Sequence, residues 1–194
     1  MDEVKKMKTS LNNLVENISA KPPINGNSYV IGIDGPAGAG KSTLAQRIAS
    51  NWRTEKATII HMDDLYDGWE NALTEQLARV LENQILKPLS MKKSASIRKY
   101  DWLNSRFSDF VEIEVSNLYI LEGVGSGQRA SRKYLDQLIW IDIEPEVGLN
   151  RVLQRDGDYL ESEMRIWQMR ERSHFEVENT RDCATFRFDG SLFI

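Results

Sequence analysis

Short apolar runs alternate along the chain with segments whose apolar residues recur every three or four positions. Runs of this kind, with little polar alternation, are typical of strands buried on both faces of a parallel sheet. Four such strands are expected, at residues 29–34, 57–60, 118–121 and 138–141. A half-exposed strand is expected at 111–115, where apolar and polar residues alternate, and a closing strand at 183–188.

The segments between these runs have helical periodicity. Helices are expected at 1–20, 44–49, 73–85, 129–134, 146–155 and 160–179. Residues 21–28 contain Pro22, Pro23 and Gly26 and are interpreted as a linker. We therefore expect an N-terminal helix and linker at 1–28, followed by a single α/β domain at 29–194 with three layers and a mostly parallel sheet.

Composition and charge narrow the class of protein. The 194 residues are 41% hydrophobic and 28% charged, which is a globular balance. One cysteine, Cys183, excludes an internal disulfide or a cysteine zinc site. The net charge of −4 argues against a nucleic-acid partner. No apolar run approaches the roughly 20 residues of a membrane span, and no signal peptide is evident, so a cytoplasmic protein without a membrane partner is expected.

A glycine-rich segment between the first strand and the next helix carries the strongest chemical signal. Residues 35–42 read GPAGAGKS and complete the pattern G-x-x-x-x-G-K-[ST]. Such a loop turns its backbone N–H groups toward phosphates at a helix N-terminus. The sequence thus predicts a P-loop NTPase fold that binds ATP. The expected nucleotide-binding residues are Gly35, Ala37, Gly38, Ala39, Gly40, Lys41, Ser42 and Thr43.

A Mg²⁺ ion normally accompanies the phosphates, held by the P-loop hydroxyl and by an acidic residue at the end of a neighbouring strand. Ser42 supplies the hydroxyl. Glu122 follows the apolar run 118–121, and the adjacent Gly123 is expected to leave space for phosphates. Asp142, which follows the run 138–141, is the competing candidate. We expect Ser42 and Glu122 to hold the metal.

Phosphate loops serve switches, motors and small-molecule kinases alike. The chain has no Asn-Lys pair to read guanine and no Asp followed three residues later by Gly, which argues against a GTPase switch. A kinase needs a base for the acceptor hydroxyl. Asp63, just after the strand 57–60, is the favoured base, and Asp64 is the rival; both could instead only cap the segment that follows.

Several short segments resemble one family of kinases. Asp63-Asp64-Leu65-Tyr66 is similar to the Asp-Ser-Phe-Tyr of uridine kinases, and the segment from Tyr100 to Arg106 is similar to their Tyr-Asp-Phe-x-x-x-x-Arg, one residue shorter. Residues 120–123 and Arg155-Asp156 resemble the apolar-Glu-Gly strand end and the start of the lid. The resemblance is to the uridine kinase, phosphoribulokinase and pantothenate kinase group. It implies a helical lid, a catalytic base at Asp63 and an acceptor pocket lined by Tyr66, Tyr100, Asp101 and Arg106.

Basic residues suggest where charge is neutralised. Arg151 and Arg155 are four residues apart and share a helix face, so Arg155 is expected to stabilise the transferring phosphoryl and Arg151 to contact substrate. Pairing with acidic neighbours on a solvated face is the alternative for such arginines. Residues 87–106 have a positive excess of five, which fits either an anionic acceptor or a solvated loop.

These expectations describe an ATP- and Mg²⁺-dependent phosphotransferase that acts on a small acceptor. The transferred γ-phosphoryl would go to a hydroxyl or a phosphate, with Asp63 as base and Lys41 and Arg155 stabilising charge. A nucleoside or nucleoside monophosphate is the leading acceptor. The alternative is a nucleotide-binding regulatory ATPase that has no small-molecule acceptor.

Overall fold

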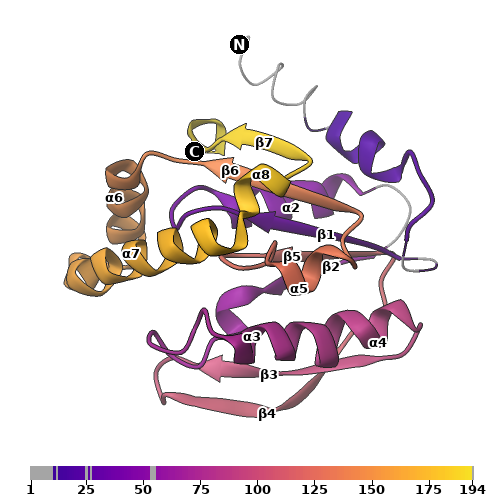
Figure 1. Ribbon diagram of the computed structural model, residues 1–194, viewed down its shortest axis with the longest axis horizontal. Helices are drawn as coiled ribbons and strands as arrows, with labels where there is room; N and C mark the ends of the chain where they lie inside the picture. The colour runs from indigo at the N-terminus through magenta and orange to yellow at the C-terminus, as the bar shows by residue number, and fades with distance from the viewer. Residues whose placement is uncertain (1–10, 12, 25, 27, 53–55, 194) are drawn as a thin grey trace.

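The computed structural model describes residues 11, 13–24, 26, 28–52 and 56–193. Its centre is a five-stranded sheet with the order β2-β5-β1-β6-β7, in which every neighbouring pair is parallel (Figure 1). The strands are β1 (Tyr29–Asp34), β2 (Ala57–His61), β5 (Leu118–Glu122), β6 (Gln137–Asp142) and β7 (Phe186–Asp189). The four buried strands expected from the apolar runs are confirmed.

One face of the sheet is covered by α2 (Lys41–Asn51) and by the helical residues 13–19. Strand residues of alternate positions point to this face, among them Ile31 and Ile33 of β1. Leu44 and Ile48 of α2 and Ile18 of the N-terminal helix are almost completely buried against them. The other half of the expected N-terminal helix, residues 1–10, lies outside the described residues.

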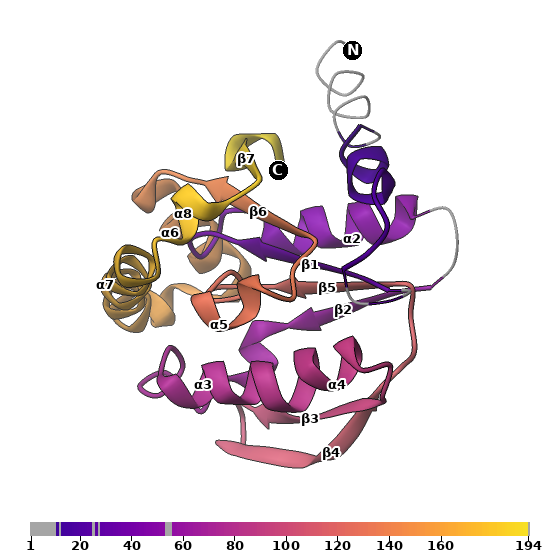
Figure 2. The same cartoon turned by 45° about the vertical axis from the view of Figure 1, so that its right-hand side comes forward.

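The opposite face of the sheet carries a second hydrophobic cluster, which includes Val30, Tyr119 and Leu121. The elements that cover it or continue from it are α3 (Glu75–Val80), a π-helical turn (Leu81–Leu86), α4 (Lys87–Ser90), α5 (Arg129–Arg132), α6 (Pro145–Asp156) and α7 (Glu161–Glu178) (Figure 2). Because helices cover both faces, the three-layer α/β P-loop fold is confirmed. Short turns complete the chain, at Met62–Leu65, Asp158–Leu160 and Gly190–Phe193, together with α8 (Thr180–Cys183).

A separate antiparallel hairpin lies beneath α3 and α4 in Figure 1. It consists of β3 (Ala95–Asp101) and β4 (Arg106–Ile113). No strand was expected at 95–101, because its charged residues Arg98, Lys99 and Asp101 mask the alternation of Ala95 and Ile97, which are buried. The solvated loop considered for 87–106 is therefore wrong: this segment is a helix end followed by a strand.

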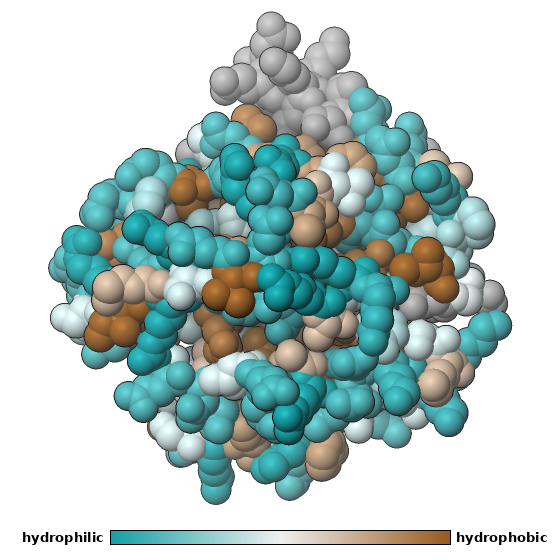
Figure 3. Space-filling view, viewed as in Figure 1, coloured by the Kyte–Doolittle hydropathy of each residue, from teal (hydrophilic) through white to brown (hydrophobic). Residues whose placement is uncertain are grey.

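Two further boundaries differ from expectation. The alternating strand ends at Ile113, and Val115 is 81% exposed beyond it. Cys183 belongs to α8 rather than to the closing strand, which begins at Phe186. The surface seen in Figure 3 is mainly hydrophilic, with small and separate hydrophobic areas. Within the described residues, no helix is long and apolar enough to cross a membrane.

Candidate active site

The phosphate loop leaves the carboxyl end of the central strand β1 and leads directly into α2. At Gly38 the backbone has φ +76°, and a Cβ atom there would lie 2.2 Å from the carbonyl oxygen of Gly148 in α6. Only glycine fits this position, so α6 can pack directly on the loop. Lys41 is buried and donates from Nζ to the carbonyl oxygens of Gly35 (2.8 Å) and Pro36 (2.7 Å).

The two expected metal ligands meet at the first turn of α2. Ser42 donates from Oγ to Oε1 of Glu122 at 3.1 Å, and Glu122 is buried at the end of β5. Burial alone would raise the pKa of Glu122, but the hydrogen bond with His61 and the charge of Lys41 outweigh burial and lower it. An ionised carboxylate beside a hydroxyl fits Mg²⁺, which is typically bound by one or two carboxylates together with phosphates and water. Among the described residues, no group of three or more acidic, histidine or cysteine side chains is arranged to hold a metal ion without other ligands.

The rival ligand, Asp142, is engaged elsewhere. Both of its carboxylate oxygens accept from Arg181, at 2.8 and 3.0 Å, and Oδ1 also accepts from Trp140. Gly123 is required by local packing. Its φ is +131°, and a Cβ atom there would lie 2.6 Å from Cβ of Met62. The expectation that it also leaves space for phosphates stays a prediction.

Glu122→Gln is expected to raise the Mg²⁺ concentration for half-maximal activity by about tenfold or more, because the substitution removes a charged oxygen ligand. A Mg²⁺ titration of ATP turnover measures this change. Asp142→Asn is the matched control, since Asp142 faces Arg181. An equal or larger shift in the Asp142→Asn protein would contradict the assignment of Glu122.

Asp63 lies in the turn that follows β2, two residues beyond His61. Partial desolvation, followed by the negative charges of Glu122 and Asp64, raises the pKa of Asp63. Asp64 forms an ion pair with Lys99 of β3, with Nζ and Oδ2 2.7 Å apart. Asp63 has no such partner among the contacts of the described residues, which leaves its carboxylate available to a hydroxyl group.

Aromatic rings form a continuous wall beside Asp63. Neighbouring ring centroids are 5.0 to 5.8 Å apart along the series Phe107, Tyr100, Trp102, Trp69, Trp167 and Tyr66. The indole of Trp102 donates to the carbonyl oxygen of Asp63 at 3.3 Å. Tyr66 is buried, and its hydroxyl donates to the carbonyl oxygen of Val124 at 2.7 Å.

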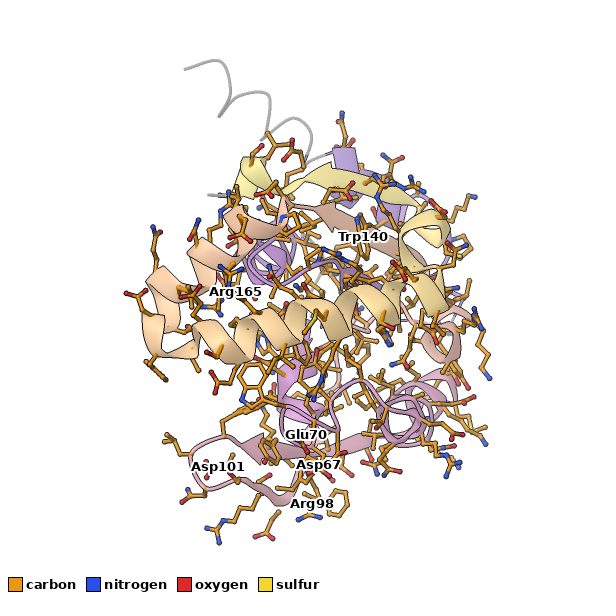
Figure 4. The ribbon with its side chains drawn as sticks, turned by 60° about the vertical axis from the view of Figure 1, so that its left-hand side comes forward. Asp67, Glu70, Arg98, Asp101, Trp140 and Arg165 are labelled. Atoms are coloured by element: carbon orange, nitrogen blue, oxygen red, sulfur yellow. The ribbon has the colours of Figure 1, made fainter. Side chains whose placement is uncertain are left out.

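Two of the expected acceptor residues lie at the hairpin turn. Asp101 accepts from the backbone N–H groups of Leu103 (3.0 Å) and Asn104 (3.1 Å) and thereby stabilises the turn. Arg106 is the register partner of Asp101 across the hairpin and is exposed. In Figure 4, Asp101 lies with Asp67 and Glu70 below α7, whereas Arg165 and Trp140 lie at or above α7.

The two arginines of α6 contact different parts of the protein. Arg155 is held by Asp156, at 2.7 and 2.6 Å, and the charges of Asp63 and Glu122 contribute to its raised pKa, so it lies toward the carboxylates of the site. Arg151 instead donates to the carbonyl oxygens of Gly38 (3.2 Å) and Gly190 (3.1 Å). Arg151 thus contacts the phosphate loop in this structure, and its expected contact with substrate stays a prediction.

Two arginines of α7 also have partners. Arg165 pairs with Glu146 and Glu161 on the surface, which is the pairing with acidic neighbours considered above for such arginines. Arg170 donates to the carbonyl oxygen of Trp69 at 2.6 Å.

Three residues of the site were missed in the sequence. Asp34 ends β1, is fully buried and accepts from the N–H groups of Gly35, Gly125 and Gly127. Its position after an apolar run was the available signal. His61 was not among the expected site residues, yet its Nδ1 forms a hydrogen bond with Glu122. Glu171 of α7 accepts from the N–H of Ala37, and no local pattern indicated that contact.

A glycine-rich loop between a central parallel strand and a helix, closed by Lys41 and Ser42 and faced by Glu122, defines a P-loop nucleotide-binding protein. The chain belongs to the family described as the KAP family P-loop domain, whose model matches residues 5–118. Glu122 and the helices α6 and α7 lie beyond the matched segment.

Individual relatives point to kinases. Uridine kinase-like protein 4 of Arabidopsis thaliana is 28% identical, over 93% of this chain and 37% of its own length. The uridine kinase of Halobacterium salinarum is 29% identical, over 66% of this chain and 63% of its own length. The structure of a possible uridine kinase from Bacillus stearothermophilus has the same fold, with a TM-score of 0.70 at 20% identity, and covers 95% of this chain and 100% of that one.

These likenesses show that the chain is similar to uridine kinases and uridine kinase-like proteins and that it has the fold of a P-loop domain. P-loop kinases use ATP with Mg²⁺ and a small phosphoryl acceptor. The chain spans less than two thirds of the length of the first two relatives.

Proposed function

We propose that this protein transfers the γ-phosphoryl group of ATP to a hydroxyl group of a small acceptor, with a nucleoside as the leading candidate. One observation carries the proposal: Asp63, Glu122 and Arg155 come from three different elements and act on one another electrostatically at the carboxyl edge of the sheet. A base, a metal-binding carboxylate and a cation in one place are the parts that phosphoryl transfer requires.

The proposed roles follow from the contacts. The backbone of residues 35–43 and Lys41 bind the phosphates, while Ser42 and Glu122 hold Mg²⁺, which supplies charge neutralisation when bound. Asp63 accepts the proton as the acceptor oxygen bonds to the γ-phosphorus and the bond from that phosphorus to the bridging oxygen breaks. Arg155 stabilises the charge on the transferring group; its side chain is largely exposed, and its only partner among the described residues is the neighbouring Asp156, which it would exchange for the phosphoryl group.

The aromatic wall supports an acceptor that contains a planar ring. The rings of Tyr100, Trp102 and Trp69 lie beside Asp63, and a base can stack on their faces or meet their edges. The excess of positive charge in residues 87–106 gives less support to an anionic acceptor than the aromatic wall gives to a nucleoside. Lys99 is paired with Asp64, and Arg98 donates to the carbonyl oxygen of Ser108 while lying over the ring of Phe107.

The test is ADP release with Mg-ATP across nucleosides, nucleoside monophosphates, pantothenate and sugar phosphates. A true acceptor is expected to raise the rate about 100-fold or more over that with water alone, because it reacts from an oriented position. A nucleoside should give the largest effect. Stimulation by a sugar phosphate alone would contradict the nucleoside, and tight ATP binding without any stimulation would favour the regulatory ATPase.

A further inference from the structure

A buried carboxylate from α7 lies against the phosphate loop. Glu171 is 4% exposed, and its Oε2 accepts from the backbone N–H of Ala37 at 3.0 Å. The side chain of Trp167, one helical turn earlier, also forms a hydrogen bond with Glu171. The carboxylate therefore uses one of the loop N–H groups that the proposed function gives to the nucleotide.

The positive charges near Glu171 do not neutralise its negative charge. Lys41 attracts it from α2, whereas the buried Asp34 of β1 repels it. Arg181 and Asp182 of α8, and Arg172 and Glu176 of α7, line the same cavity of about 320 Å³. Lys41 also interacts with Glu122 and Asp34, so a single buried lysine faces three buried carboxylates.

Desolvation is therefore the largest influence on the pKa of Glu171. It raises the pKa of Glu171 to about 7, although Lys41 and the Ala37 N–H lower it. The carboxylate is therefore about half ionised at neutral pH. A nucleotide brings several more negative charges to the same N–H groups and the same lysine, and like charges in a buried site cannot all remain ionised.

We propose that Glu171 controls access of nucleotide phosphates to the loop: its ionised carboxylate competes for the Ala37 N–H and for Lys41, and ATP binds when this carboxylate is protonated. This inference rests on the proposed function, since it assumes that ATP binds at this loop. Glu171 is then a positioning residue, because it acts on the nucleotide through the loop.

The test compares ATP binding by the wild-type and Glu171→Gln proteins at pH 6 and pH 8, measured by titration calorimetry. If binding requires protonation of a group with a pKa of about 7, wild-type affinity falls about tenfold over this range. Glutamine has no charge, so the variant should lack this fall and bind ATP about tenfold more tightly than wild type at pH 8. Protonation of ATP itself affects both proteins equally, so it cancels when the two pH dependences are compared.

Glu163→Gln is the control, because Glu163 is an exposed residue of the same helix. It should retain the wild-type pH dependence. If Glu171→Gln does not fold, Glu171→Ala and the wild-type protein alone serve: wild type should take up close to one proton per ATP bound at pH 8, measured in buffers of different ionisation enthalpy.

The outcomes separate the two ideas. Equal or weaker ATP binding by the folded Glu171 variants at pH 8, or no proton uptake by wild type, would overturn the inference. If neither wild type nor any variant binds ATP at either pH, the proposed function itself fails.

Discussion

Asp63→Asn is expected to lower the rate of phosphoryl transfer by about 1,000-fold and to leave ATP affinity nearly unchanged. General base catalysis contributes about 10²- to 10⁴-fold, and asparagine is isosteric but cannot accept the proton. The side chain of Asp63 is exposed, so no buried hydrogen bond is lost with the charge. Acceptor-dependent ADP release and ATP binding by calorimetry, measured on the same preparation, check both parts.

The pH profile adds a second readout for Asp63. Its pKa is raised by partial desolvation and by Glu122 and Asp64, so the wild-type rate should fall on acidification at a pH above the usual aspartate range. Asp64→Asn is the matched control: it removes the ion pair with Lys99, which is worth little at a partly exposed site, and one of the charges that raise the pKa of Asp63. It should keep most of the activity, with the acidic fall of the rate moved to lower pH. Turnover that survives Asp63→Asn would rule out this residue as the base.

Asp34→Ala is expected to reduce the free energy of unfolding by about 4 kcal/mol, since a buried donor left without a partner costs about 1–3 kcal/mol. Three such donors, the N–H groups of Gly35, Gly125 and Gly127, depend on the carboxylate of Asp34. Burial raises the pKa of Asp34 to about 6, although these three hydrogen bonds and Lys41 favour its charged form. Denaturant unfolding monitored by tryptophan fluorescence gives the change.

Asp136→Ala provides the comparison for Asp34. Asp136 also accepts from two backbone N–H groups, those of Ile24 and Val30, but it is only half-buried, so water can replace it. Its loss should cost about 1 kcal/mol, close to the net value of an ordinary hydrogen bond. Equal destabilisation by the two substitutions would show that burial of the Asp34 contacts has no special weight.

The sequence predicted the parts of the fold whose signals are local. The apolar runs located the four central strands, and the phosphate-loop pattern located the turn into α2 with its lysine and serine. Glu122 could also be proposed, because a carboxylate that follows a buried parallel strand must emerge at the same edge as that loop.

What the sequence did not predict depends on contacts between distant residues. Glu171 lies 134 positions from Ala37, and only the packing of α7 on the loop brings them together. The contact of Arg151 with Gly38 of the phosphate loop was not predicted for a similar reason: a helix pattern gives the shared face of Arg151 and Arg155 but not the element on which each side chain packs. Strand β3 was missed because a hairpin with few apolar positions lacks the alternation that identifies strands.

The register of β2 on β5 has a consequence for how this site can change. His61 and Glu122 are direct partners in that ladder, and Asp63 follows two residues later. The spacing between the proposed base and the proposed metal ligand is therefore set by the main-chain hydrogen bonds of β2 and β5 and by the two residues from His61 to Asp63, not by side-chain rotamers. Loops at the amino edge of the sheet can vary in length without moving these groups. One residue inserted or deleted within β2 would instead turn Ile60 or Met62 toward Glu122 and disable the site in a single step.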